Sequence, residues 1–115
     1  MLLELLGWSA LAIAGYFLVE FTIKFVRDKI DEYFTEKKVE AVIVAEISAI
    51  MKNCKNIRSY KVLKKAREKG YTHIIIKTSG GKIDGGVEIY EDTLDTPDPE
   101  VKNLLGEEKM VIIER

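Results

Sequence analysis

The chain has 115 residues, a net charge of −1, a single cysteine and a single histidine. This length suffices for one modest core, and the near-neutral charge by itself favours no nucleic acid or other polyanion as a partner. One cysteine excludes an internal disulfide framework and is typical of a reducing compartment. One cysteine and one histidine cannot form a zinc site of ordinary ligand number within one chain.

The first 27 residues are strongly apolar and predict one membrane-spanning helix. The 19 residues at positions 5–23 carry a single charge, that of Glu20. As a helix they would span about 28 Å, close to the ~30 Å hydrocarbon core of a bilayer. Their apolar side chains fall on every side of such a helix, whereas a surface helix of a globular domain keeps a polar face. We therefore expect a transmembrane anchor over residues 1–30 and a small α+β domain over residues 31–115.

Positive charges follow the apolar run and none precedes it, which predicts the orientation of the anchor. Lys24, Arg27 and Lys29 lie just C-terminal to the run, and the end richer in Lys and Arg stays in the cytoplasm. The domain after the anchor is therefore expected to be the cytoplasmic part of a single-pass membrane protein.

Small residues within the anchor provide a candidate surface for a second membrane helix, because they let helix backbones approach closely. This candidate helix-packing face consists of Gly7, Ala10 and Ala14. The alternative is that glycine and alanine are simply common in membrane helices.

Helical periodicity continues after the anchor. An apolar stripe with a charged opposite face extends the first helix to about residue 34, and residues 35–38 interrupt it. A second helix is expected over residues 39–53, although its Val-Ile-Val centre would suit a strand equally well. A third helix is expected over residues 56–70. Its buried side would be Ser59, Val62, Leu63 and Ala66.

The C-terminal part changes to an alternating pattern and predicts three strands. The first two are residues 71–77 and 87–90, joined by the glycine-rich residues 79–86. A short helix is expected behind Asp98 and Pro99, followed by a third strand at residues 109–113. The expected order after the anchor is therefore α-α-β-β-α-β. The third strand, placed beside the first, would complete a small antiparallel sheet with helices on one face.

Charge is unevenly distributed along the chain. Residues 52–82 carry ten Lys or Arg and one acid, whereas residues 83–115 carry three Lys or Arg and ten acids. The basic segment could bind phosphate groups of anionic lipid or, less favourably, of nucleic acid. The alternative is a solvated helix face that meets the acidic C-terminal third. The candidate contacts to an anionic ligand are Lys61, Lys64, Lys65, Lys69 and Lys82.

No residues form a recognisable catalytic, cofactor or metal site. The loop at residues 79–86 offers the backbone N–H groups of an anion nest, but it lacks the P-loop spacing and opens no helix, which favours a simple strand connection. His73 is expected to be structural. Cys54 has lysine neighbours that would lower the pKa of its thiol, yet one thiol without a partner is a weak indication of chemistry. We therefore expect no enzyme activity, cofactor or metal.

The N-terminal leucine-rich segment Leu2-Leu3-Glu4-Leu5-Leu6, followed by an apolar helix and a small sheet, resembles a type IV pilin. The prepilin cleavage context is missing, the positive charges favour a cytoplasmic domain, and additional helices precede the strands. No residue role is therefore transferred from that family.

Three functional hypotheses remain. The leading one is a non-enzymatic, single-pass membrane accessory or assembly subunit whose cytoplasmic domain docks on protein partners, which would be other membrane or membrane-proximal subunits. The second is a membrane-tethered module that binds a phosphate-bearing ligand: anionic lipid, nucleotide or, less favourably, nucleic acid. The third is a soluble structural protein with its N-terminal helix buried in an oligomer. The sequence leaves a small-molecule ligand undetermined.

Overall fold

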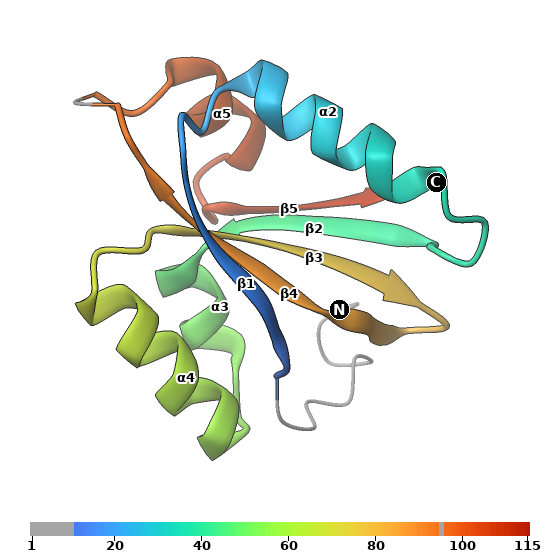
Figure 1. Cartoon of the computed structure of the whole chain (residues 1–115), viewed down its shortest axis with the longest axis horizontal. Helices are drawn as coiled ribbons and strands as arrows, with labels where there is room; N and C mark the ends of the chain where they lie inside the picture. Colours follow the sequence, from blue (N-terminus) through green and yellow to red (C-terminus); the bar gives the residue numbers. More distant parts are fainter. Residues whose placement is uncertain (1–10, 95) are drawn as a thin grey trace.

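The computed structural model describes residues 11–94 and 96–115 and arranges them in three layers (Figure 1). The elements in chain order are β1 (Ile13–Val19), α2 (Ile23–Phe34), β2 (Ala41–Glu46), α3 (Ile47–Asn53), α4 (Ile57–Glu68), β3 (His73–Ser79), β4 (Lys82–Asp92), α5 (Pro99–Leu105) and β5 (Met110–Glu114). The strands form one sheet in the order β1-β4-β3-β2-β5. The β1–β4 pair is parallel and the other pairs are antiparallel.

The sheet has an apolar core on each of its faces. Successive side chains of a strand point to opposite faces, so Ile43 packs toward the layer of α3 and α4, while Val44 packs toward the layer of α2 and α5. Leu63 of α4 belongs to the first core and Val26 of α2 belongs to the second, and all four side chains are buried. Helices therefore cover both faces of the sheet.

The predicted membrane helix is wrong for the residues that the structure describes. Residues 13–19 form strand β1, and α2 begins only after Thr22, whose hydroxyl accepts a hydrogen bond from the backbone N–H of Phe25 (3.1 Å). Within residues 11–94 and 96–115, no helix combines the length and the apolar character needed to cross a membrane. A short apolar run that forms a strand cannot be distinguished from part of an apolar helix by periodicity. The predicted single-pass membrane location and orientation depended on this helix, so they are wrong as well.

The predicted helix over residues 39–53 is also wrong. Residues 41–46 form β2, and only residues 47–53 are helical, as α3. Strand β2 lies between β3 and β5, and its residues Ala41 to Ala45 are all buried. A strand that is covered on both faces has a continuous apolar sequence without alternation. Such a sequence is also typical of a buried helix, which explains why a helix was predicted here.

The predicted small antiparallel sheet with helices on one face is replaced by a mixed five-stranded sheet with helices on both faces. Strand β5 pairs with β2 and does not reach β3, because β2 takes the position beside β3. Two strands that the sequence had suggested as helices, β1 and β2, therefore account for the difference in architecture.

The elements predicted between residue 56 and the C-terminus are present, but the second predicted strand, residues 87–90, is much longer as β4 (Lys82–Asp92). The predicted glycine-rich loop over residues 79–86 is therefore wrong for residues 82–86, which belong to β4. Helix α4 begins behind Asn56, whose side chain accepts a hydrogen bond from the N–H of Ser59 (2.9 Å). Helix α5 begins with Pro99 behind its cap Asp98. The connection between β3 and β4 is a tight turn, in which Gly80 (φ 59°) and Gly81 (φ 75°) have the positive φ that a two-residue hairpin turn requires.

Candidate functional site

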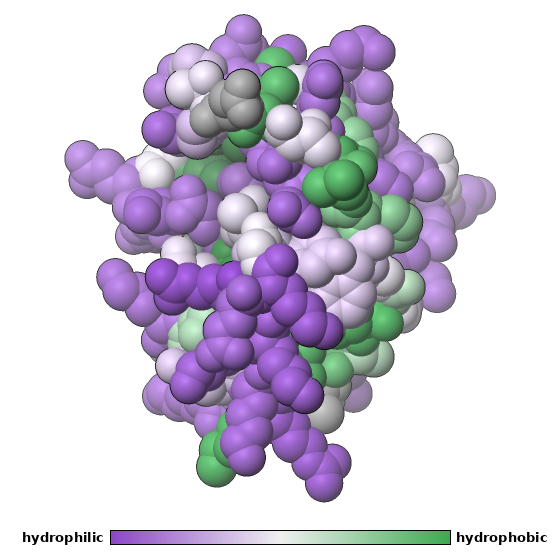
Figure 2. Space-filling model, turned by 60° about the vertical axis from the view of Figure 1, so that its left-hand side comes forward, coloured by the Kyte–Doolittle hydropathy of each residue, from purple (hydrophilic) through white to green (hydrophobic). Residues whose placement is uncertain are grey.

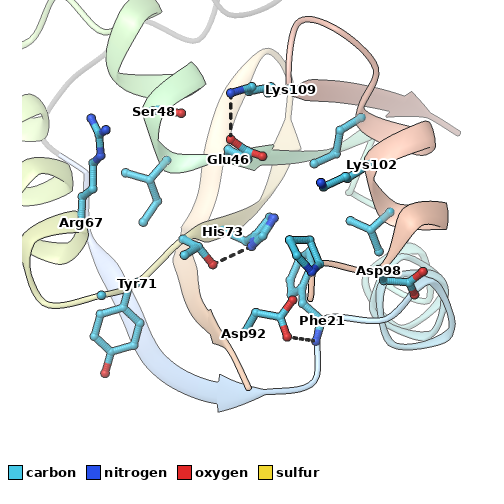
Figure 3. Close-up of a pocket in the computed structure, with 16 residues that line it drawn as sticks. Phe21, Glu46, Ser48, Arg67, Tyr71, His73, Asp92, Asp98, Lys102 and Lys109 are labelled. Atoms are coloured by element: carbon cyan, nitrogen blue, oxygen red, sulfur yellow. Dashed lines mark hydrogen bonds and ion pairs between the residues drawn. The ribbon is translucent and has the colours of Figure 1, made fainter. Parts of the chain in front are cut away.

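A pocket of about 440 Å³ lies at the end of the sheet where β2 and β4 end and β3 begins (Figure 3). This volume falls within the range of small-molecule sites. Segments that are far apart in the sequence supply its walls. The polar and aromatic side chains that line it include Phe21, Glu46, Ser48, Arg67, Thr72, His73, Asp92, Asp98, Lys102 and Lys109.

His73, the first residue of β3, lies at the centre of this lining. One face of its ring stacks on Phe21, with ring centroids 4.3 Å apart and 17° between the planes. Its Nδ1 atom lies 2.7 Å from the hydroxyl oxygen of Thr72. Burial lowers the pKa of His73, and the carboxylates of Glu46 and Asp92 oppose part of this effect. The imidazole is therefore neutral at neutral pH.

The carboxylates of the pocket are engaged by the protein itself. Asp92 accepts hydrogen bonds from the backbone N–H groups of Phe21 (3.3 Å) and Leu94 (2.9 Å). Asp98 accepts one from the N–H of Ile23 (2.9 Å) and one from the N–H of Glu100 (3.0 Å). Two of the three acids thus hold the loops around the pocket in place.

The third acid, Glu46, forms an ion pair with Lys109, with the carboxylate oxygen 3.7 Å from Nζ. Lys109 has a positive φ of 57° and directly precedes β5. Its side chain is largely solvent-exposed, so the pair is a weak one. These two charges nevertheless offset each other at the upper wall of the pocket in Figure 3.

Arg67 and Lys102 are the remaining charged side chains of the lining. Arg67 comes from the last turn of α4 and Lys102 from α5, and Figure 3 shows them on opposite sides of His73. Neither forms an ion pair with any residue in the described part of the chain. The pocket therefore carries positive charge on two walls that the described residues leave uncompensated.

The lysines predicted from the sequence lie elsewhere. Lys61, Lys64 and Lys65 line a shallow hollow of about 400 Å³ along the outer side of α4. Lys69 caps the end of α4, and Lys82 opens β4 in the hairpin, on the opposite side of the molecule in Figure 1. The structure thus groups three of the five lysines and separates Lys82 from them. Their role in anion binding stays a prediction.

Ala14 and Cys54 do not line the pocket. Ala14 lies in β1, an edge strand, and Gly7 and Ala10 lie outside the described residues. The Cys54 thiol donates a hydrogen bond to the backbone oxygen of Asn56 (3.5 Å). Burial raises the pKa of Cys54, and a backbone hydrogen bond with Asn56 offsets part of this effect. A raised pKa opposes formation of the reactive thiolate, contrary to the effect expected of the neighbouring lysines.

Sequence reasoning noticed His73 but missed Arg67 and Lys102. Both are single exposed cations on helices rich in charge, and no local spacing distinguishes them from solvated side chains. They become neighbours of one pocket because α4 and α5 lie on opposite faces of the sheet and both reach its end.

Comparison with known proteins adds no assignment, since no protein family, curated protein or solved structure matches the chain. Among the described residues, no group of three or more His, Cys, Asp and Glu side chains is placed to hold a metal ion.

Proposed function

We propose that this domain binds a small anion with carboxylate or phosphate groups in the pocket at the end of the sheet. The observation that carries the proposal is a pair of cations, Arg67 and Lys102, that have no ion-pair partner among the described residues. They lie on opposite walls of a pocket whose described acids are engaged by backbone N–H groups or by Lys109. The guanidinium group of arginine offers paired donors that match carboxylate and phosphate oxygens. A bound anion would neutralise both walls.

His73 would supply a neutral donor between the two cations. When Nδ1 accepts the hydroxyl proton of Thr72, the neutral ring carries its own proton on Nε2. No described residue occupies Nε2 with a hydrogen bond, so this N–H can donate to an oxygen of the ligand. The neutral state also avoids the desolvation cost of a further positive charge in the pocket.

We further propose binding without conversion, and the partners of the same histidine support it. A histidine that activates a hydroxyl nucleophile is held by an acidic partner on its second nitrogen, which stabilises the imidazolium formed during the reaction. Among the described residues no such partner is hydrogen-bonded to His73. The proposal therefore keeps the sequence-based expectation that the chain is not an enzyme.

The proposal modifies the second hypothesis drawn from the sequence. It retains an anionic ligand but moves it from the outer lysines of α4 to Arg67 and Lys102, and it drops the membrane tether. Docking on a protein partner, the leading hypothesis, remains a prediction without its membrane component.

The single histidine of the chain makes a direct test possible. Its imidazole signals can be followed by NMR during titration with pyrophosphate and, separately, with succinate. We expect a saturable shift with at least one of these anions and a rise in the pKa of His73, because an added negative charge favours the imidazolium. Arg67→Gln and Lys102→Gln should each weaken binding at least about tenfold, as the loss of a charged hydrogen bond does.

Lys64→Gln is the matched control, because this residue lies on the outer hollow of α4 and carries the same charge. It should leave the affinity unchanged. An affinity that falls with Lys64→Gln and not with Arg67→Gln would place the anion on α4, as the sequence alone had suggested. Imidazole signals that do not respond to either anion would refute the proposed site.

A further inference from the structure

Strand β1 is an edge strand of the sheet formed by the described residues, and its sequence is unusual for an edge strand. It pairs with β4 on one side and is the outermost strand of the sheet. Its sequence, Ile-Ala-Gly-Tyr-Phe-Leu-Val, contains neither a charge nor a proline. Edge strands usually carry such residues because their free N–H and C=O groups can pair with another chain. Strand β1 lacks this protection.

Apolar side chains of β1 are exposed on both faces of the sheet. Tyr16 is 43% exposed and contacts Tyr71 (ring centroids 4.8 Å apart). Phe17 is 41% exposed and stacks on Tyr90 (5.5 Å) toward α2, and Leu18 is 66% exposed. On the side shown in Figure 2, apolar and weakly polar surface lies next to a strongly hydrophilic region. Both cores of the sheet thus continue to its edge, where the described residues leave them partly exposed.

The charges around β1 differ between its two ends. At its start, the N–H of Leu11 donates a hydrogen bond to Ser59 in the first turns of α4 (2.9 Å), beside the exposed Arg58 and Lys61. At its end, Leu18 and Val19 lie next to Glu91 and Asp92 of β4, and Glu20 follows directly. The strand therefore runs from a basic to an acidic end.

We propose that β1 pairs with β1 of a second copy, antiparallel and centred on Tyr16, so that two sheets join into one. In this arrangement the basic end of each copy meets the acidic end of the other, whereas a parallel arrangement would oppose like charges. The uncharged centre can face itself without repulsion. A two-fold contact of this kind also closes, so that it forms a dimer rather than a filament.

Sedimentation equilibrium of the full chain tests the dimer. Leu18→Lys places a charge on an exposed side chain of the pairing strand, and it should weaken association at least about tenfold while circular dichroism shows the fold intact. Ile57→Lys is the matched control, since Ile57 is 72% exposed on α4. It should leave the dimer intact. A monomeric wild type, or association that both variants weaken equally, would overturn the proposal in favour of no association or of non-specific apolar contact.

Disulfide cross-linking in a Cys54→Ala background tests the direction of pairing. In the antiparallel arrangement Tyr16→Cys lies opposite its own copy and should cross-link. Leu18→Cys should not, because its two copies are displaced by about 13 Å along the strands, beyond the Cα separation of about 7 Å that a disulfide spans. Cross-linking of both variants would indicate parallel strands, and cross-linking of neither would contradict β1 pairing altogether.

Discussion

The protonation of His73, which lines the pocket, affects the free energy of unfolding of the domain. Burial lowers its pKa in the folded state below the ordinary value of 6.5, despite the opposing carboxylates. Between pH 6.5 and the folded-state pKa, His73 is therefore largely protonated in the unfolded chain and largely neutral in the folded chain. We expect the free energy of unfolding to be constant above about pH 7 and to decrease as the pH falls from 6.5 toward the folded pKa.

Urea unfolding at a series of pH values between about 7.5 and 5.5 measures this effect, since most carboxylates titrate below that window. His73→Gln should be less stable overall, because it loses the stack on Phe21, but its stability should not change across the window. An equal pH dependence in both proteins would assign the effect to another group.

Tyr90 is a second residue whose environment makes a measurable prediction. Its hydroxyl donates to Glu88 (2.6 Å), while its ring packs near Phe17, Phe21 and Phe25. Tyr90→Phe keeps the ring contacts and removes only the hydrogen bond to a charged acceptor. We expect a loss of about 1.5 kcal/mol in the free energy of unfolding, at the low end for such bonds because Glu88 also pairs with Lys29.

Chemical denaturation measures the loss, and Tyr60→Phe provides the control. Tyr60 is an exposed tyrosine on α4, so its change should stay within about 0.5 kcal/mol. If Tyr90→Phe were equally neutral, the hydrogen bond to Glu88 would not contribute to the folded state.

At the scale of elements, Gly86 permits β1 to lie against β4. It has a φ of +105°, and a Cβ atom there would lie 2.6 Å from the backbone oxygen of Ala12. That oxygen accepts the N–H of Val87 (2.8 Å) at the start of the parallel pair. Gly86→Ala must therefore strain the backbone and separate the strands, and we expect a loss of about 2 to 3 kcal/mol in a urea titration.

Gly80→Ala separates the two causes of the loss expected for Gly86→Ala, which are backbone strain and the close contact with Ala12. Gly80 also has a positive φ (+59°), but a Cβ atom there would meet nothing within 4 Å. Only the backbone strain remains, which costs about 1 kcal/mol. Equal losses in the two variants would mean that the contact between β1 and β4 adapts to the added methyl group.

The elements that sequence reasoning recovered share a local cause. The N-cap of α4 bonds to a backbone group three residues away, Pro99 and Asp98 start α5, and two glycines shape the hairpin. Each interaction joins residues close in the chain, so the pattern can be read without knowledge of the fold. Strands β1 and β2 have no such markers, and their apolar runs are compatible with a helix.

At the scale of the whole molecule, the three layers create the pocket. Helices α4 and α5 lie on opposite faces of the sheet, and each brings one cation to the same end of it. The sheet contributes His73 between them. Neither helical layer alone would form the site, so ligand binding is expected to depend on the complete sandwich rather than on any one segment.

The sequence by itself determined the helices and turns whose capping and glycine residues act within a few positions, and it indicated an α+β fold. Tertiary structure decided whether residues 13–19 and 41–46 are helical or extended. Apolar side chains are buried about equally well in either conformation, and the choice came from partners far away, such as Val87 opposite Ile13 and Ile76 opposite Ile43. The same long-range packing brought Arg67, His73 and Lys102 around one pocket, because only the assembled sheet carries α4 and α5 to its common end.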